Sequence, residues 1–133
     1  MSIKAVIDTN VLVSAFLTKN TNSPTYRVAD AILDGKFTPV YSLAMFDEYV
    51  DVLGRDYLKL PQSSVEELLM HIKLFGKEVV PAESDAHFPD LDDKVFFCTA
   101  LAGEAHLVTG NMKHYPKADY IVTPAQFCDI VGI

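Results

Sequence analysis

Residues 3–17 read Ile-Lys-Ala-Val-Ile-Asp-Thr-Asn-Val-Leu-Val-Ser-Ala-Phe-Leu, and this stretch predicts a buried strand followed at once by a helix. Its first part, 3–8, is short, rich in β-branched residues and ends in the carboxylate of Asp8. Its second part, 10–17, is a compact apolar segment that favours a helix. A strand that turns directly into a helix is typical of an α/β fold with a parallel sheet.

The rest of the chain continues this alternation of strands and helices. Further strands are predicted at 37–41, 78–80, 106–109 and 120–123, and further helices at 24–33, 43–53, 64–75, 95–105 and 124–132. Ser64 and Glu67 form a capping-box pattern that predicts a helix start. Because the strands are rich in Val and Ile rather than strictly alternating, both faces of the sheet should be covered. The prediction is a three-layer α/β/α fold around a parallel sheet of about five strands.

Length and composition favour one folded domain over residues 1–133. Half of the residues are hydrophobic and 22% are charged, which supplies a core and excludes disorder as the main state. The apolar runs fall short of the roughly 18 residues that span a bilayer, and the N-terminus lacks a signal-like apolar segment, so we expect a cytoplasmic protein without membrane association. Cys98 and Cys128 form no CxxC pattern and are predicted to be buried free thiols.

The charge of the chain limits how it can bind nucleic acid. It has 11 Lys and Arg against 18 Asp and Glu, a formal net charge of −7. This sign is wrong for a protein that holds nucleic acid by electrostatics alone. A polyanionic substrate would therefore need cations or a basic partner.

Several common chemistries are not supported by any motif. The sequence contains no GxGxxG, no GxxxxGK[ST] and no GxSxG, which argues against the usual nucleotide cofactors and against a serine hydrolase. Its four histidines do not form HExxH, so a histidine-ligated zinc site is unsupported. The functional candidates that remain are Asp and Glu side chains.

Each candidate carboxylate, taken alone, has both a functional and a purely structural interpretation. Asp8 lies at the carboxyl end of the first strand, where open parallel sheets bind ligands, but it can equally cap the helix that follows. Glu48 borders the apolar side of its helix and can equally be solvated. Asp92 and Asp93 stand at the start of a helix, where carboxylates favour the helix dipole whatever the function, and one of the two is expected to be a cap.

Taken in order, these carboxylates and their neighbours resemble the PIN domain family. The matching segments are Asp8-Thr-Asn10 after the first strand, Glu48 in the helix after the second, Asp93 six residues before Thr99-Ala-Leu-Ala102, and Val108-Thr-Gly-Asn111 after the fourth. The resemblance covers essentially the whole chain and is closest to the VapC-type toxins of prokaryotic toxin–antitoxin systems. It implies a PIN-like fold.

The resemblance also implies a set of site residues. The expected catalytic residues are Asp8, Glu48, Asp93 and Asn111, and the first three are the expected metal ligands. Further candidates are Asp92, Asn10 and Thr109. Asn111 stands where the family usually has Asp, which leaves one or two metal ions open, and Asp92 competes with Asp93 for the third ligand position.

Physical chemistry agrees with this resemblance. Carboxylates gathered in one pocket repel each other unless they take up protons or a hard divalent cation, and oxygen ligands suit Mg²⁺ or Mn²⁺. Such an ion supports hydrolysis of a phosphodiester bond. The resemblance implies an endoribonuclease acting on single-stranded RNA, with an antitoxin protein as partner and a homodimeric state. The basic residues nearest in sequence, candidates to contact phosphates, are Lys94, Lys113, His114 and Lys117.

Two other interpretations compete with this one. An aspartyl-phosphate phosphatase would need a second Asp at Asn10, and a receiver domain would carry its Asp on a middle strand, so neither pattern is met. A catalytically inert PIN-fold module that binds an antitoxin or another partner is supported by Asn111 and by the charge of −7. The presence of the other three acidic residues argues against it.

Overall fold

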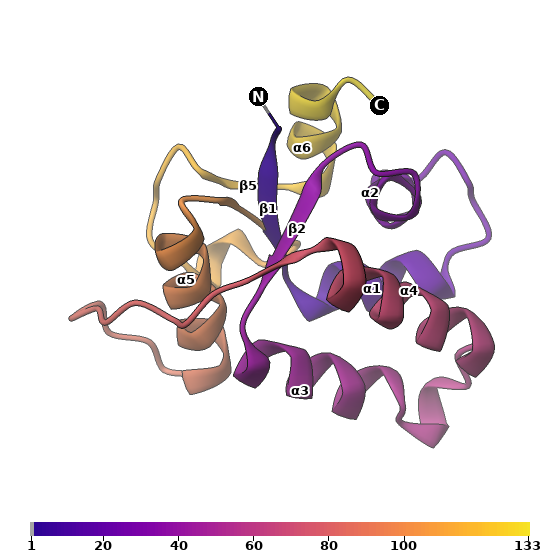
Figure 1. Cartoon of the computed structure of the whole chain (residues 1–133), viewed down its shortest axis with the longest axis horizontal. Coiled ribbons are helices and arrows are strands. Elements are labelled where there is room, and N and C mark those ends of the chain that lie inside the picture. Colours follow the sequence, from indigo (N-terminus) through magenta and orange to yellow (C-terminus); the bar gives the residue numbers. More distant parts are fainter. Residues whose placement is uncertain (1) are drawn as a thin grey trace.

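The computed structural model describes residues 2–133, which form a parallel sheet with helices between the strands (Figure 1). The strands are β1 (Lys4–Ile7), β2 (Thr38–Tyr41), β3 (Lys77–Glu78), β4 (His106–Val108) and β5 (Ile121–Val122). The helices are α1 (Thr9–Leu17), α2 (Pro24–Leu33), α3 (Leu43–Leu53), α4 (Gln62–Phe75), α5 (Leu91–Gly103) and α6 (Pro124–Val131). Short 3₁₀ turns occupy Asp56–Leu58 and Met112–His114.

The five strands lie in the order β3-β2-β1-β4-β5, and every neighbouring pair is parallel. The central strand β1 pairs Lys4 with Thr38 of β2 and Val6 with Leu107 of β4. Val6 and Leu107 are completely buried, as expected for a strand covered on both faces. The predicted parallel sheet of five strands is confirmed.

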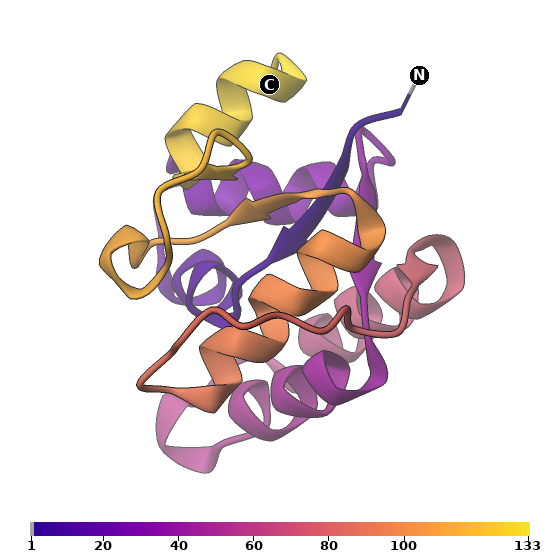
Figure 2. The ribbon, with the colours of Figure 1, turned by 90° about the vertical axis from the view of Figure 1, so that its left-hand side faces the viewer.

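Helices cover both faces of this sheet. Figure 2 shows α5 in front of the strands and α2 behind them. On one face of the sheet, α5 packs on β1, β2 and β4. On the other face, α2 packs against α1, α4 and α6. This is the predicted three-layer α/β/α fold.

Most predicted helix boundaries agree with the structure, but two starts are wrong. The fourth helix begins at Gln62, before Ser64, so the predicted capping box does not start it. The fifth begins at Leu91, four residues before the predicted Val95, and Asp90 is its N-cap, accepting a hydrogen bond of 2.9 Å from the amide of Asp92. Its first turn, residues 91–94, has three charged side chains and no buried apolar residue, so apolar periodicity could not reveal it.

One glycine makes the packing of α5 on the sheet possible. A Cβ at Gly103 would lie 2.7 Å from Cγ1 of Val40 on β2. We expect Gly103→Ala to lower the free energy of unfolding by about 1 to 3 kcal/mol, because the added methyl overpacks the helix–sheet contact. Urea unfolding measures the loss.

The matched test of this contact is a double-mutant cycle with Val40. Val40→Ala removes the methyl groups that the new Cβ would meet, so Gly103→Ala should cost less in that background than in the wild type. Equal costs in both backgrounds would show that the contact between these two residues is not the cause.

Both cysteines lie in the interior of the fold. Cys98 and Cys128 are buried free thiols, as predicted. Among residues 2–133, no helix combines the length and the apolar character that a membrane crossing requires.

Candidate active site

Asp8 lies where the order of the sheet reverses. The chain passes from β1 to β2 on one side, and later returns to place β4 on the other side of β1. Asp8 directly follows β1, and its amide donates to the carbonyl of Val108 at 2.9 Å, which holds it beside the carboxyl end of β4. Crevices at such reversal points are the usual ligand sites of open α/β sheets.

The side chain of Asp8 is buried, with 5% of its surface exposed. Its Oδ2 accepts hydrogen bonds from the Thr109 hydroxyl at 2.8 Å and from the Tyr115 hydroxyl at 3.1 Å. Burial raises the pKa of the Asp8 carboxyl, and these two hydrogen bonds oppose the rise. Asp8 occupies the N-cap position of α1, but its carboxylate is engaged across the sheet.

Glu48, on α3, lies beside the first turn of α1. The Thr9 hydroxyl donates a hydrogen bond of 2.6 Å to its Oε2. Burial, followed by the proximity of the Asp92 and Asp8 carboxylates, raises the pKa of Glu48 to about 7. The structure therefore brings Glu48 into electrostatic contact with Asp8, although 40 residues separate them in sequence.

Buried polar contacts hold α3 in this position. The hydroxyls of Ser42, the N-cap of α3, and Thr99 of α5 are hydrogen-bonded at 2.8 Å, and both residues are fully buried. The Tyr49 hydroxyl donates to the carbonyl of Ile7, at the end of β1. Because unpaired polar groups in a core are costly, these contacts fix α3 against α5 and β1.

Asp92 and Asp93 both lie at the site, on different sides of it. The Tyr115 hydroxyl is 3.4 Å from Oδ1 of Asp93, and Nδ1 of His114 is 3.2 Å from its Oδ2. Burial, with the Asp90 and Asp8 charges, raises the pKa of Asp93. Asp92 instead lies close to the carboxyl of Glu48. The expectation that one of the two caps the helix is wrong, because Asp90 is the cap.

The remaining candidates surround Asp8. Thr109 is fully buried, and its hydroxyl also accepts a hydrogen bond of 3.0 Å from the amide of Asn111. The side chain of Asn10 accepts a hydrogen bond of 3.2 Å from the amide of Gly110 through Oδ1. Asn111 is exposed. The structure thus ties Asn111 to the site through its backbone.

Tyr115 lies within the candidate site, although no sequence pattern indicated it. Its side chain is 6% exposed and its ring packs against Phe88, with centroids 5.9 Å apart. Burial and the neighbouring Asp8 and Asp93 charges raise the pKa of the Tyr115 hydroxyl, which therefore stays a neutral donor between two carboxylates. Residues 110–120 form an irregular connection without periodicity, so no sequence signal located it.

Within residues 2–133, no three His, Cys, Asp or Glu side chains are arranged to hold a metal ion. The carboxylates are instead linked through hydroxyl groups: Tyr115 lies between Asp8 and Asp93, and Thr9, which follows Asp8, bonds to Glu48. Of the predicted phosphate contacts, His114 is placed against Asp93.

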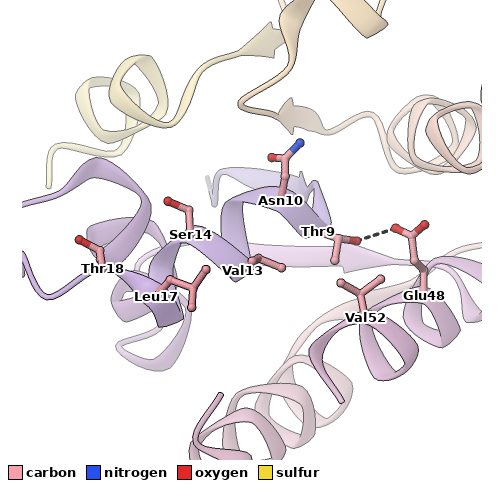
Figure 3. Close-up of a pocket in the computed structure, with 8 residues that line it drawn as sticks. All are labelled: Thr9, Asn10, Val13, Ser14, Leu17, Thr18, Glu48 and Val52. Atoms are coloured by element: carbon pink, nitrogen blue, oxygen red, sulfur yellow. Dashed lines mark hydrogen bonds between the residues drawn. The ribbon is translucent and has the colours of Figure 1, made fainter. Parts of the chain in front are cut away.

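A pocket of about 590 Å³ adjoins these carboxylates between α1 and α3 (Figure 3). Thr9 and Glu48, which are hydrogen-bonded to each other, both line the pocket and connect it to the group of carboxylates described above. The other residues that line it are Asn10, Val13, Ser14, Leu17, Thr18 and Val52.

The raised pKa values predict that the metal-free protein becomes more stable as the pH falls from about 8 to about 5.5. The pKa of Glu48 is about 7 in the fold against an ordinary value of 4.5, so in this range the folded protein keeps a proton that the unfolded chain releases. The raised pKa values of Asp8 and Asp93 act in the same direction. We expect a gain of about 1 to 2 kcal/mol after solvent screening, measured by urea unfolding in EDTA.

Glu48→Gln is the control for this pH dependence. It removes the group whose pKa is about 7 and should reduce the gain in stability between pH 8 and pH 5.5, with Asp8 and Asp93 left to contribute the rest. If wild-type stability instead fell as the pH was lowered over this range, the carboxylates would not be mutually destabilised in the fold.

No curated protein matches the chain. A family model described as PIN domain matches residues 4–113, which extend from β1 to the 3₁₀ turn after β4. This span contains Asp8, Glu48, Asp93 and Asn111, while Tyr115 lies just beyond it. Since the match covers most of the chain, the protein belongs to the PIN domain family.

Proposed function

We propose that this protein is a Mg²⁺- or Mn²⁺-dependent endoribonuclease that hydrolyses phosphodiester bonds of single-stranded RNA. PIN domains are generally nucleases that use divalent metal ions, and the family suggests binding of RNA. The observation that carries the proposal is the buried Asp8 carboxylate, which Tyr115 links to Asp93 and whose charge contributes to the raised pKa of Glu48.

The donor atoms suit a hard divalent cation, although among residues 2–133 no three of these side chains are arranged to hold one. All candidate ligand atoms are carboxylate oxygens. Burial raises the pKa values of Asp8, Glu48 and Asp93, and neighbouring carboxylates add to the rise for Glu48 and Asp93. Both side-chain hydrogen bonds to Asp8 end on Oδ2, so they leave Oδ1 for another ligand. Asp8, Glu48 and Asp93 would hold the ion, with Asp92 as the competing ligand. When bound, it would lower the pKa of a water and stabilise charge on the phosphate.

The residues around the carboxylates position them for this chemistry. Thr109 and Tyr115 donate to the same oxygen of Asp8 and so fix its orientation. Thr9 does the same for Glu48. Hydrogen-bond donors to a ligating side chain orient it and tune its basicity.

The first test is a metal titration of RNA cleavage. A fluorescently labelled single-stranded RNA is incubated with the protein in EDTA and then with millimolar Mn²⁺ or Mg²⁺. Cleavage that requires the metal supports the proposal. An RNA left intact under every condition would contradict it.

We also propose that the protein acts as the toxin of a toxin–antitoxin pair, as a cytoplasmic homodimer. The support is the resemblance to VapC-type toxins and the charge of −7, which suits a basic protein partner. A small DNA-binding protein encoded next to this gene, whose co-expression relieves growth arrest, is the expected partner. Size-exclusion chromatography with light scattering tests the homodimer.

An inert PIN-fold interaction module is the second candidate. It is favoured by one observation, the exposed Asn111 at the position of the family's fourth acidic residue. Calorimetric titration with Mn²⁺ separates the two, because an inert fold has no need to bind the ion and the proposed enzyme does.

A further inference from the structure

The pocket between α1 and α3 lies directly beside the candidate active site. Thr9 and Glu48 form its wall on that side, and their side chains are joined by the 2.6 Å hydrogen bond drawn in Figure 3. A substrate held at the carboxylates would therefore extend into this pocket without leaving the protein surface.

The pocket is suited to an uncharged part of a substrate. Of the eight described residues that line it, Glu48 alone carries a charge, and that charge is negative. Val13, Leu17 and Val52 provide an apolar surface. Away from Glu48 the lining offers no cationic side chain to a phosphate, whereas a nucleobase can bury its apolar faces against the aliphatic side chains.

The side chain of Asn10, at the rim of the pocket, can form a hydrogen bond with the edge of a base. Oδ1 of Asn10 accepts a hydrogen bond from the Gly110 amide, which orients the side chain and leaves its NH₂ group as a donor. Asn10 lies next to Thr9 on the wall nearest the carboxylates. A carbonyl oxygen of a base is a suitable acceptor for that donor.

We infer that this pocket binds one unpaired base of the RNA, from a nucleotide adjoining the bond that is cleaved. The inference rests on the proposed ribonuclease function. A base in a duplex is stacked and paired and cannot enter without being extruded, so the pocket gives a physical reason for a preference for single strands.

The test is cleavage of RNA that lacks single bases. A single-stranded RNA is compared with versions that carry an abasic ribose at each position flanking the cut, in Mn²⁺. We expect wild-type kcat/KM to fall about tenfold or more at one of these positions, since burial of a base is lost there. Equal cleavage of all versions would overturn the inference and leave the ribonuclease function standing.

Val52→Phe fills the pocket and should remove this dependence. The variant is expected to cleave intact and abasic RNA within about twofold of each other, with unchanged Mn²⁺ affinity by calorimetry. Val50→Phe is the matched control, because Val50 lies on the same helix outside the pocket and is 52% exposed. It should behave as the wild type does.

Three other results would decide against the inference. If folded Val52→Phe kept the full abasic effect, the base would bind elsewhere. If Val50→Phe lost the effect as well, the pocket would not be its source. If wild type cleaved no RNA at all, the proposed function would fail and this inference with it. Should Val52→Phe not fold, Ser14→Leu fills the same pocket from an exposed position on α1.

Discussion

Asp8→Asn is expected to abolish Mn²⁺-stimulated RNA cleavage, a loss of about a hundredfold or more. The substitution removes the one carboxylate that is both buried and in electrostatic contact with Glu48 and Asp93. Labelled single-stranded RNA, analysed on denaturing gels at saturating Mn²⁺, measures the loss.

The same variant should fold as well as the wild type or better. Asn keeps an oxygen that can accept from Thr109 and Tyr115, while the cost of burying a charge near other carboxylates disappears. The melting temperature in EDTA is therefore expected to be unchanged or raised. Asp129→Asn, at an exposed position on α6, is the matched control and should alter neither property.

Opposite results would identify Asp8 as a structural residue. A variant that melts well below the wild type, but whose remaining folded fraction cleaves normally, would mean that Asp8 only holds Thr109 and Tyr115 in place. The catalytic assignment of Asp8 would then be wrong.

The second large effect concerns RNA affinity. We expect the isolated protein to bind single-stranded RNA weakly in EDTA and at least about tenfold more tightly in millimolar Mg²⁺ or Mn²⁺. Its charge of −7 repels phosphates, and the site itself concentrates Asp8, Glu48, Asp92 and Asp93. Fluorescence titration at low salt, with gels to confirm that the RNA remains intact, measures the affinity.

Asp8→Asn is the control for this metal dependence as well. If the ion acts at the proposed site, the variant should gain less affinity from Mn²⁺ than the wild type does. Tight binding by wild type in EDTA would instead show that a basic surface dominates, with Lys94, Lys113 and Lys117 as the first residues to replace.

The fold was largely predictable because its signals are local. The run 3–8 is short and apolar and ends in Asp8, and the chain then turns at once into a helix, as β1 and α1 do. The third strand was harder, since β3 consists of two exposed residues, Lys77 and Glu78, rather than the predicted 78–80. An edge strand this short leaves little pattern in a sequence.

Residues of the candidate site were predictable only where a suitable residue type stands at the end of a strand or in a recognisable motif. Asp8 directly follows a strand, a position that predicts either ligand binding or capping of the next helix. Tyr115 offered no such signal, because its importance depends on a loop that brings its hydroxyl between Asp8 and Asp93. The orientations of Asp92 and Asp93 likewise depend on where α5 begins, and its polar first turn concealed that start.

The hydrogen bonds around Asp8 also bear on when the site can form during synthesis. They join residues 101 and 107 positions apart, and the bond from Thr9 to Glu48 spans 39. A nascent chain that has not yet reached Tyr115 lacks one of the groups that hold Asp8, and one that ends before β4 also lacks Thr109. Proteins are made from the N-terminus onward and domains generally fold as units. The ribosome would therefore have to pass Tyr115 before the acidic residues could assemble with all of their hydrogen-bond donors.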